Sequence, residues 1–443
     1  MTRAATACNL RGDALVPGDK SISHRALILA ALADGSSHIE GFLPCQDCLA
    51  TLDCLHHLGV MIDRNGACSV QVVGTGLDRF QSSGAPVTLD CRRSGTTMRL
   101  LAGMLAGQRM KATLLGEPQL MRRPMRRVVA PLREMGARIA DTNGTAPLRI
   151  EGRPLQGVAH QLAVPSAQVK SAILLAGLSA SGITRVKQDA PTRDHTERML
   201  RAMGAPIVFG EDGSEVVMSG TDSLRPLSFS VPGDLSSAAF LLAGALITPD
   251  SDITIRHVGV NPTRTGLLDV LSAMGAELDL TTEEHEATGG EPVATIRARS
   301  STLVGVTVGG SLIPRMIDEL PIFALVASQA SGRTIVKDAH ELRVKETDRI
   351  ETVVSELRRL GASIVSTEDG FVIDGPSPLH GGEVSDHGDH RLAMMLAIAS
   401  LIAPGVRRLP AGKDCTDDSF PGFFALLEKL RVGRSSTQRK VVQ

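Results

Sequence analysis

The sequence contains no tryptophan and no tyrosine, which leaves 10 phenylalanines as its large aromatic side chains. Proteins that bind single-stranded nucleic acids usually stack the bases on aromatic rings. Basic and acidic residues also nearly cancel, and the net charge of -1 gives no basic field that would attract a polyanion. We therefore expect no nucleic-acid partner, and any anion site must come from a local cluster of cations.

Long apolar runs are absent as well. The start, MTRAATACNLRGDALVPG, lacks the apolar core of a signal peptide, and no apolar run reaches membrane-spanning length without a charge or a turn. Among the 7 cysteines only Cys45 and Cys48 have CxxC spacing, and no second pair completes a zinc site. We expect a cytoplasmic protein that has no membrane segment and uses neither a metal nor another cofactor.

What the sequence does contain is internal repetition. A short pattern that ends a helix and enters a strand recurs along the chain, with a glycine at the point where the helix must stop. Glycine suits this position because it adopts the left-handed conformation without a Cβ clash. The five clear copies are LHHLGVMI, LREMGARI, LRAMGAPI, LSAMGAEL and LRRLGASI, and a worn sixth copy near the C-terminus is LLEKLRVG.

A second recurring pattern, apolar all round, precedes each of these copies and predicts a buried helix. The apolar stretches are residues 26–35, 99–107, 171–182, 238–247, 322–332 and 393–405. The repeat reads buried helix, strand, outer helix, strand, with a period of roughly 70 to 90 residues. Because 443 residues exceed what one hydrophobic core usually supports, we expect six units in two domains of three.

The stretch in front of each buried helix predicts where a ligand binds. These stretches read PGDKSISHR, CRRSGTTMR, VPSAQVKS, VPGDLSS, IPRMIDEL and SDHGDHR, and each is a turn followed by a helix start. A helix start presents free N–H groups and the positive end of the helix dipole. With Lys20, Arg25, Arg99 and Arg391 beside them, converging helix starts would form an anion site.

Two charged stretches add candidate chemistry. ELRVKETDRIE, residues 341–351, is by itself typical of a solvated helix start, yet its cations could also meet a phosphate and hold Glu346 ionised. Asp318, in IPRMIDELP, enters a buried helix, a costly placement for a carboxylate unless it caps the helix or acts as a base. In DHGDHR we expect Asp389 to cap a helix and His390 to be hydrogen-bonded rather than to bind a metal.

Seven motifs occur in order along nearly the whole chain: PGDKSISHR, SGTTMR, RRPM, PSAQVKSA, IDELP, RVKETDR and DHR. As a set they resemble the EPSP synthases, the 3-phosphoshikimate 1-carboxyvinyltransferases. The resemblance implies an α/β fold of two inverse domains, each of three βαβαββ units around buried parallel helices. It implies that residues 1–17 and 231–443 form the first domain and residues 18–230 the second, with the active site in the cleft between them. We expect a monomer.

The resemblance also implies the reaction. The family transfers the enolpyruvyl group of phosphoenolpyruvate to the 5-hydroxyl of shikimate 3-phosphate and releases phosphate, a step toward chorismate and the aromatic amino acids. Two substrates that each carry phosphate and carboxylate groups call for several cations. The chemistry also needs a proton removed from a hydroxyl and a proton delivered to a methylene.

Carried over position by position, the resemblance assigns three groups of residues. The expected catalytic residues are Lys20, Asp318 and Glu346, with Asp318 as the base toward the 5-hydroxyl. The residues expected to contact shikimate 3-phosphate are Lys20, Ser21, Arg25, Ser166, Gln168, Thr192, Arg193, Asp318 and Lys345. The residues expected to contact phosphoenolpyruvate are Lys20, Gly95, Arg123, Gln168, Arg349 and Arg391.

The sequence departs from the family pattern at several places; Ala167 replaces a second Ser, and Glu341 replaces an Asn contact to substrate. Arg92 and Arg93 stand where the loop before Gly95 often has Gly-Asn, and Asp418 stands where some members have Lys. These changes predict an altered phosphoenolpyruvate pocket and one lost phosphate contact. Two alternatives stay open. The sister transferase that acts on UDP-N-acetylglucosamine usually has a reactive cysteine that GEPQLMRRPM lacks, and a non-catalytic anion-binding paralogue would need cations but no placed carboxylates.

Overall fold

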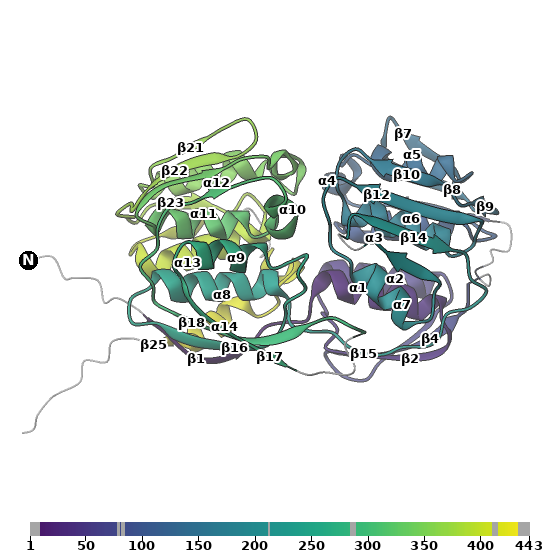
Figure 1. Cartoon of the computed structure of the whole chain (residues 1–443), viewed down its shortest axis with the longest axis horizontal. Helices are drawn as coiled ribbons and strands as arrows, with labels where there is room; N and C mark the ends of the chain where they lie inside the picture. The colour runs from purple at the N-terminus through teal and green to yellow at the C-terminus, as the bar shows by residue number, and fades with distance from the viewer. Residues whose placement is uncertain are drawn as a thin grey trace, which may run out of the picture.

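The computed structural model describes residues 9–77, 80, 85–210, 213–283, 289–409 and 415–432. It has two lobes that lie side by side (Figure 1). One hydrophobic core is built from residues between Ile22 and Val231. The other is built from Leu10, Ala14 and residues between Leu235 and Leu430. We call these the 18–230 lobe and the 231–443 lobe, and the latter includes the N-terminal strand.

The elements of the 18–230 lobe follow one another as helices and short strands. In chain order they are α1 (Lys20–Leu32), β2 (Asp34–Glu40), α2 (Gln46–His57), β3 (Met61–Arg64), β4 (Ser69–Thr75), β5 (Val87–Asp90), α3 (Gly95–Ala106), β6 (Lys111–Leu115), α4 (Pro118–Met121), α5 (Arg126–Glu134), β7 (Arg138–Thr142), β8 (Thr145–Glu151), β9 (Leu155–Gln156), β10 (Ala159–Leu162), α6 (Ala167–Gly177), β11 (Ala180–Ser181), β12 (Ile183–Gln188), α7 (His195–Ala202), β13 (Ile207–Phe209), β14 (Glu215–Ser219) and β15 (Ser228–Ser230).

The 231–443 lobe has the same succession of elements. They are β1 (Asn9–Leu15), α8 (Leu235–Ile247), β16 (Asp252–Gly259), α9 (Gly266–Ala273), β17 (Glu277–Glu283), β18 (Val293–Arg299), β19 (Thr307–Val308), α10 (Leu312–Met316), α11 (Leu320–Gln329), β20 (Gly332–Val336), the 3₁₀ helix η1 (His340–Val344), α12 (Arg349–Arg359), β21 (Ile364–Ser366), β22 (Phe371–Gly375), β23 (Glu383–Ser385), α13 (His390–Ile402), β24 (Arg407–Leu409), the 3₁₀ helix η2 (Thr416–Asp418), α14 (Phe423–Leu430) and β25 (Arg431–Val432).

The repeat predicted from the sequence is confirmed by the sheets. Five sheets share one order, in which a parallel pair of strands is followed by two antiparallel strands, as in β5-β6-β8-β7 and β19-β20-β22-β21. The sixth unit retains only the parallel pair β23-β24 among the described residues, and its β25 instead joins the edge of β1. The worn sixth sequence copy therefore corresponds to a shortened unit.

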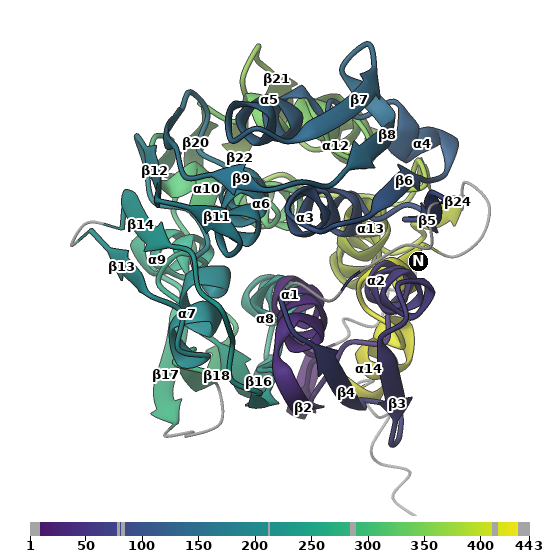
Figure 2. The same ribbon diagram turned by 90° about the vertical axis from the view of Figure 1, so that its right-hand side faces the viewer.

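The helices predicted to be buried form the inside of each lobe. In one lobe α3 contacts both α1 and α6, and in the other α8, α11 and α13 contact one another. Figure 2 shows the sheets outside these helices. These helices lie inside because they are apolar on every face, and such a helix is stable only when neighbours cover all of its faces. The prediction of six buried helices is confirmed.

The glycines that end the outer helices adopt the predicted backbone conformation. Gly59, Gly136, Gly204, Gly275 and Gly361 all have φ between 86° and 98°. A residue with a Cβ is strained there, which explains why each clear copy of the pattern has glycine. The glycine of the sixth copy lies outside the described residues.

The chain crosses between the lobes twice, through two segments that both read Val-Pro-Gly-Asp, residues 16–19 and 231–234. The two crossings run antiparallel and hydrogen-bond to each other, with Asp19 N 2.8 Å from the Pro232 carbonyl and Asp234 N 2.9 Å from the Pro17 carbonyl. A Cβ on Gly18 would lie 1.9 Å from the Gly41 carbonyl oxygen, so glycine is required there. The crossings place the starts of α1 and α8 next to each other.

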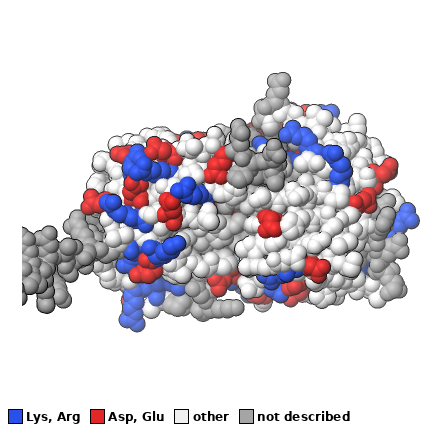
Figure 3. Space-filling model, turned by 90° about the horizontal axis from the view of Figure 1, so that it is seen from below, with Lys and Arg blue, Asp and Glu red and all other residues white. Residues whose placement is uncertain are grey.

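Charges of both signs are mixed on the outer surface of the sheets. On the face seen in Figure 3, basic and acidic side chains lie beside one another. Ion pairs on the sheet around β16 include Arg256 with Asp13 at 2.7 Å and Arg297 with Asp252 at 2.7 Å. Among the described residues, no helix is long and apolar enough to cross a membrane.

Candidate active site

A cavity of about 380 Å³ lies between the lobes and is lined by residues of both. The starts of all six buried helices reach it, represented by Lys20, Thr96, Gln168, Ser236, Asp318 and His390 with their neighbours. Five of these helices begin at a capping side chain, namely Asp19, Ser94, Ser166, Asp234 and Asp389. The convergence of helix starts predicted from the sequence is therefore confirmed.

The structure brings the residues of the predicted site together with a single exception, Arg25. The residues that line the cavity are Lys20, Ser21, Gly95, Arg123, Ser166, Gln168, Thr192, Arg193, Asp318, Lys345, Glu346, Arg349 and Arg391. Arg25 is buried behind the wall, where its guanidinium donates to the Ser21 carbonyl, Ser171 Oγ and Thr196 Oγ1. In this structure it supports the start of α1 and does not face the cavity.

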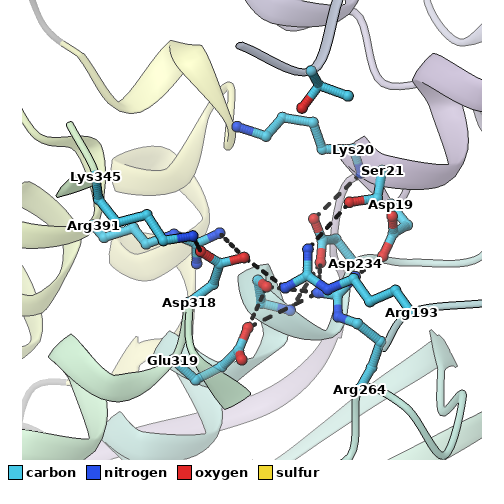
Figure 4. A network of polar contacts seen from close by, with 12 residues as sticks. Asp19, Lys20, Ser21, Arg193, Asp234, Arg264, Asp318, Glu319, Lys345 and Arg391 are labelled. Carbon is cyan, nitrogen blue, oxygen red and sulfur yellow. Dashed lines mark hydrogen bonds and ion pairs between the residues drawn. The ribbon is translucent and has the colours of Figure 1, made fainter. Parts of the chain in front are cut away.

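Asp318 lies at the centre of the site, between cations from both lobes (Figure 4). Its Oδ2 accepts a hydrogen bond from Arg193 Nη2 at 2.5 Å and lies 3.8 Å from Arg391 Nη2. Its Oδ1 lies 3.6 Å from Lys345 Nζ and 3.5 Å from Arg349 Nη1. Burial alone would raise the pKa of Asp318, but the four cations outweigh it and hold the pKa well below its usual value.

Glu346 forms a second carboxylate centre. Its side chain lies 2.6 Å from Arg349 Nη2 and 3.3 Å from Arg123 Nη2, the latter across the cleft. Burial would raise the pKa of Glu346, but Arg349 and Arg123 outweigh it and keep the pKa well below its usual value. Arg349 is in turn fixed by Asp389, whose Oδ2 lies 2.8 Å from Arg349 Nε. The prediction that cations of RVKETDR hold Glu346 ionised is confirmed.

Lys20 enters the cavity from the first turn of α1. Its Nζ donates to Asp47 Oδ2 at 3.1 Å. Burial would lower the pKa of Lys20, but Asp47 and Cys45 outweigh burial and raise it. Lys20 is therefore a protonated cation in this structure. Ser21, the next residue, accepts a hydrogen bond from Arg193 Nη1 at 3.3 Å, so the hinge side of the cavity is also polar.

Arginines of the 18–230 lobe surround the start of α3. Arg99 Nη1 donates to Gln168 Oε1 at 2.7 Å, and Gln168 Nε2 donates to Thr96 Oγ1 at 2.9 Å. A Cβ on Gly95 would lie 2.7 Å from Arg99 Nη1 and 3.1 Å from Arg123 Nη1. Gly95 thus leaves room for both guanidinium groups.

Thr192 and Ser166 line the same wall through a polar network. Thr192 Oγ1 hydrogen-bonds to the Gln188 side chain, whose Oε1 also accepts from the Ser166 backbone N at 3.1 Å. The Thr192 carbonyl accepts from Lys170 Nζ at 3.2 Å. This buried network fixes the loops in front of α6 and α7. Gln168 lies in the first turn of α6, and Arg193 lies in the loop before α7.

Sequence reasoning missed Arg264, which holds the two crossings together. Its Nη1 donates to Asp19 Oδ2 at 2.7 Å, and its Nη2 donates to Asp234 Oδ1 at 3.0 Å and Ser236 Oγ at 2.6 Å. Glu319, the residue after Asp318, accepts a hydrogen bond from the same Ser236 hydroxyl. The Arg264 motif, NPTRTG, gives no sequence signal for this role, because its carboxylate partners Asp234 and Asp19 are 30 and 245 residues away in the chain.

In DHGDHR the structure agrees with the prediction for Asp389 but not with the hydrogen bond expected for His390. Asp389 caps α13 by accepting from Arg391 N at 2.9 Å, as expected. His390 Nε2 is buried and has no hydrogen-bond partner among the described residues, so the expected hydrogen bond is not found at this atom. Burial and nearby Lys20 lower the pKa of His390 to about 3, which makes the ring neutral. His390 lines the cavity instead.

Two further pairs of residues close the cleft at its rims. Arg127 makes a bidentate ion pair with Glu341 across the cleft, at 2.9 and 3.0 Å. Arg93 Nη1 lies 2.9 Å from Asp418 Oδ2, also across the cleft. Arg92, by contrast, pairs with Asp53 and Gln46 of its own lobe and does not line the cavity. Of the two arginines in this loop, only Arg93 reaches the site.

Comparison with known proteins places this geometry in a family. Residues 5–427 match the sequence model of EPSP synthase (3-phosphoshikimate 1-carboxyvinyltransferase). The chain belongs to the EPSP synthase family. A 3-phosphoshikimate 1-carboxyvinyltransferase of Geobacillus kaustophilus is 51% identical over 426 residues, covering 95% of this chain and 98% of that relative. One from Brevibacillus brevis is 47% identical over 432 residues, covering 97% and 100%.

Solved structures agree with the sequence relatives. An EPSP synthase from Acinetobacter baumannii superposes with a TM-score of 0.83 at 40% identity, covering 96% of each chain. The EPSP synthase fold expected from the motifs, with repeated α/β units in two inverse halves, is therefore confirmed.

Proposed function

We propose that this chain transfers the enolpyruvyl group of phosphoenolpyruvate to the 5-hydroxyl of shikimate 3-phosphate and releases phosphate. The observation that carries the proposal is the position of Asp318, an ionised carboxylate among four cations that belong to both lobes. A site that only bound anions would gain nothing from this carboxylate, because it repels the ligand. Addition of a hydroxyl to the enolpyruvyl group of a phosphorylated donor calls for such a base.

The cations of the cavity suit two substrates that carry phosphate and carboxylate groups. Arg349 Nη1 and Arg123 Nε are buried and have no hydrogen-bond partner among the described residues. Unpaired buried donors are costly, and a bound anion would satisfy them. Arg123, Arg349, Arg391 and Lys20 would hold phosphoenolpyruvate beside Gly95, with Gln168 contacting both substrates.

Shikimate 3-phosphate would occupy the part of the cavity nearer the hinge. Ser21, Ser166, Gln168, Thr192 and Arg193 all line the cavity from the 18–230 lobe and would contact this substrate. Lys345 would contact the ring hydroxyl from the other lobe. Arg25, which the resemblance also assigns to this substrate, would act from behind the wall by holding Ser21.

Asp318 would remove the proton from the 5-hydroxyl. Its pKa in the unliganded protein is low because Lys345, Arg391, Arg193 and Arg349 surround it. The two anionic substrates would neutralise part of this positive charge, which raises the pKa of the carboxyl and its strength as a base. Substrate binding would thus prepare the base at the moment when the hydroxyl is in place.

Lys20 and Glu346 would handle the remaining protons. Lys20 holds its proton and lies beside the proposed phosphoenolpyruvate position, so it is placed to donate to the methylene or to the leaving phosphate. Glu346 is ionised and fixed by Arg349 and Arg123. It would exchange a proton with the methyl group as the tetrahedral intermediate forms and collapses. The proton that the methylene gains in the addition step would be removed again from the methyl group in the elimination step, and the proton taken from the hydroxyl would leave on the released phosphate.

We also propose that the two lobes are the two domains of the protein, residues 1–17 with 231–443 and residues 18–230, and that the protein is a monomer. One chain supplies both walls of the cavity, so a second copy is not needed to complete the site. Light scattering at micromolar concentration should give the mass of one chain, and a dimer would contradict this part of the proposal.

The experiment that tests the reaction is a comparison of acceptors. Purified protein is mixed with phosphoenolpyruvate and either shikimate 3-phosphate, unphosphorylated shikimate or UDP-N-acetylglucosamine, and inorganic phosphate is measured. We expect release with shikimate 3-phosphate alone. Release with UDP-N-acetylglucosamine would identify the sister transferase, and release with none of the three would indicate a binding protein.

A further inference from the structure

Arg93 makes contacts that join the lobes at one end of the cavity. It belongs to the 18–230 lobe, in the loop before α3, and lies two residues from Gly95. Its Nη1 donates to Asp418 Oδ2 at 2.9 Å and its Nη2 donates to the Gly388 carbonyl at 3.3 Å. Both partners belong to the 231–443 lobe, one in η2 and the other in the turn before α13.

Gln119 extends this set of contacts to a second point of the opposite lobe. Its Oε1 accepts from Arg93 Nε at 3.1 Å and from Arg93 Nη2 at 2.9 Å. Its Nε2 donates to the Glu346 backbone carbonyl at 2.8 Å. Arg93 therefore reaches Asp418 and Gly388 directly and the Glu346 loop through one amide. We call this set, Arg93 with Asp418, Gly388 and Gln119, the Arg93 bridge.

The Arg93 bridge differs from the other ion pairs that cross the cleft here. In Arg193–Asp318 and Arg123–Glu346 both partners line the cavity, so bound substrates would compete for them. Asp418 does not line the cavity in the described part of the chain. All three guanidinium nitrogens of Arg93 already have protein partners. A bound substrate therefore does not need to displace these contacts, and the Arg93 bridge can persist through the reaction.

Burial makes the Arg93–Asp418 contact stronger than an ordinary surface pair. The side chain of Asp418 is 16% exposed and that of Arg93 is 31% exposed. Two other carboxylates, Asp47 and Glu117, also act on Asp418 and disfavour its charge. Without Arg93, Asp418 would be a partly buried carboxylate facing two like charges, which is unfavourable for the closed arrangement of the lobes.

We propose that Arg93 is a positioning residue that, through Asp418, Gly388 and Gln119, holds the lobes closed over phosphoenolpyruvate and fixes the Glu346 loop. This inference rests on the proposed function. It gives two of the departures from the family pattern, Arg93 and Asp418, one shared explanation, since the arginine and the carboxylate are partners. The lost phosphate contact expected at Asp418 is then accompanied by a new contact between the lobes.

The test is a double-mutant cycle with Arg93→Gln and Asp418→Asn, followed by steady-state kinetics for each substrate. Each single change should raise KM for phosphoenolpyruvate by about 5-fold and change kcat less, because closure is weakened while the reacting groups remain. The KM of the double variant for phosphoenolpyruvate should be about that of either single variant, because both changes remove the same contact. Arg92→Gln is the matched control and should leave KM within about 2-fold.

Other outcomes would overturn the proposal. If Arg93 bound phosphoenolpyruvate directly, Arg93→Gln would raise KM while Asp418→Asn would leave it unchanged or lower it, since a competing carboxylate is gone. Additive effects of the two changes would also contradict a shared bridge. Failure of the proposed function would look different, because the unmodified protein would then release no phosphate from shikimate 3-phosphate and phosphoenolpyruvate. Phosphate release by each variant at saturating substrate shows that it is folded.

Discussion

Asp318 Oδ2 accepts a hydrogen bond from Arg193 Nη2 at 2.5 Å, and this contact joins the two lobes at the centre of the cavity. The base and one of its cations thus come from opposite lobes. If Asp318 is the base, Asp318→Asn should lower kcat by about 10²- to 10⁴-fold and leave substrate binding intact or tighter, because a negative charge is removed beside two anions. Stopped-flow phosphate release and calorimetric titration measure the two quantities.

A matched control for that change is Asp338→Asn. Asp338 is an exposed carboxylate at the rim of the same cavity, and its Oδ2 accepts a hydrogen bond from Gly310 N at 2.9 Å. Its positive φ of 64° is one that asparagine tolerates well. We expect kcat to change by less than about 3-fold. Undiminished turnover in Asp318→Asn would remove the proposed base.

Gly95 sets the space available to two guanidinium groups. In Gly95→Ala the new Cβ would lie 2.7 Å from Arg99 Nη1 and 3.1 Å from Arg123 Nη1, so at least one of them must move. We expect KM for phosphoenolpyruvate to rise by about 10-fold and KM for shikimate 3-phosphate to change less, since Arg123 is assigned to the former. Initial-rate kinetics with each substrate varied in turn provide the test.

Gly136→Ala separates this local effect from a general effect of replacing glycine. Gly136 ends α5 with φ of 98°, and a Cβ there would meet nothing within 4 Å. The substitution should lower the free energy of unfolding by about 1 kcal/mol without changing either KM. Equal effects of both alanine variants on KM for phosphoenolpyruvate would refute the role given to Gly95.

Arg25 offers a prediction about stability. Its guanidinium satisfies Ser171, Thr196 and the Ser21 carbonyl inside the 18–230 lobe. Arg25→Gln should lower the free energy of unfolding by about 3 kcal/mol, since buried partners are left unsatisfied. Arg185→Gln, which removes an exposed arginine of the same lobe, is the comparison. Urea denaturation measures both, and a higher KM for shikimate 3-phosphate without loss of stability would instead make Arg25 a direct ligand.

Local patterns explain why much of the site could be predicted from the sequence. Lys20, Gly95 and Asp389 stand at helix starts, where the turn, the cap and the apolar run that follows are adjacent in the chain. Such signals need no knowledge of the fold, and the repeated units showed that the starts would converge. The motif set then assigned roles to particular side chains.

The sequence could not predict the ion pairs between residues that are distant in the chain. Arg93 and Asp418 are 325 residues apart, and Arg264 and Asp19 are 245 apart. A charged residue taken alone is equally compatible with a solvated surface, a ligand contact or an ion pair. Arg25 shows the same difficulty, because its place behind the wall follows from the packing of α1 against α6 and α7 rather than from the motif around it.

The most direct test of the central claim is the identity of the product. Phosphoenolpyruvate and shikimate 3-phosphate are incubated with the protein, and the mixture is analysed by mass spectrometry while phosphate is counted in parallel. The account predicts an enolpyruvyl ether of shikimate 3-phosphate, formed in equal amount with inorganic phosphate. Phosphate released with pyruvate and unchanged shikimate 3-phosphate, or no phosphate at all, would contradict it.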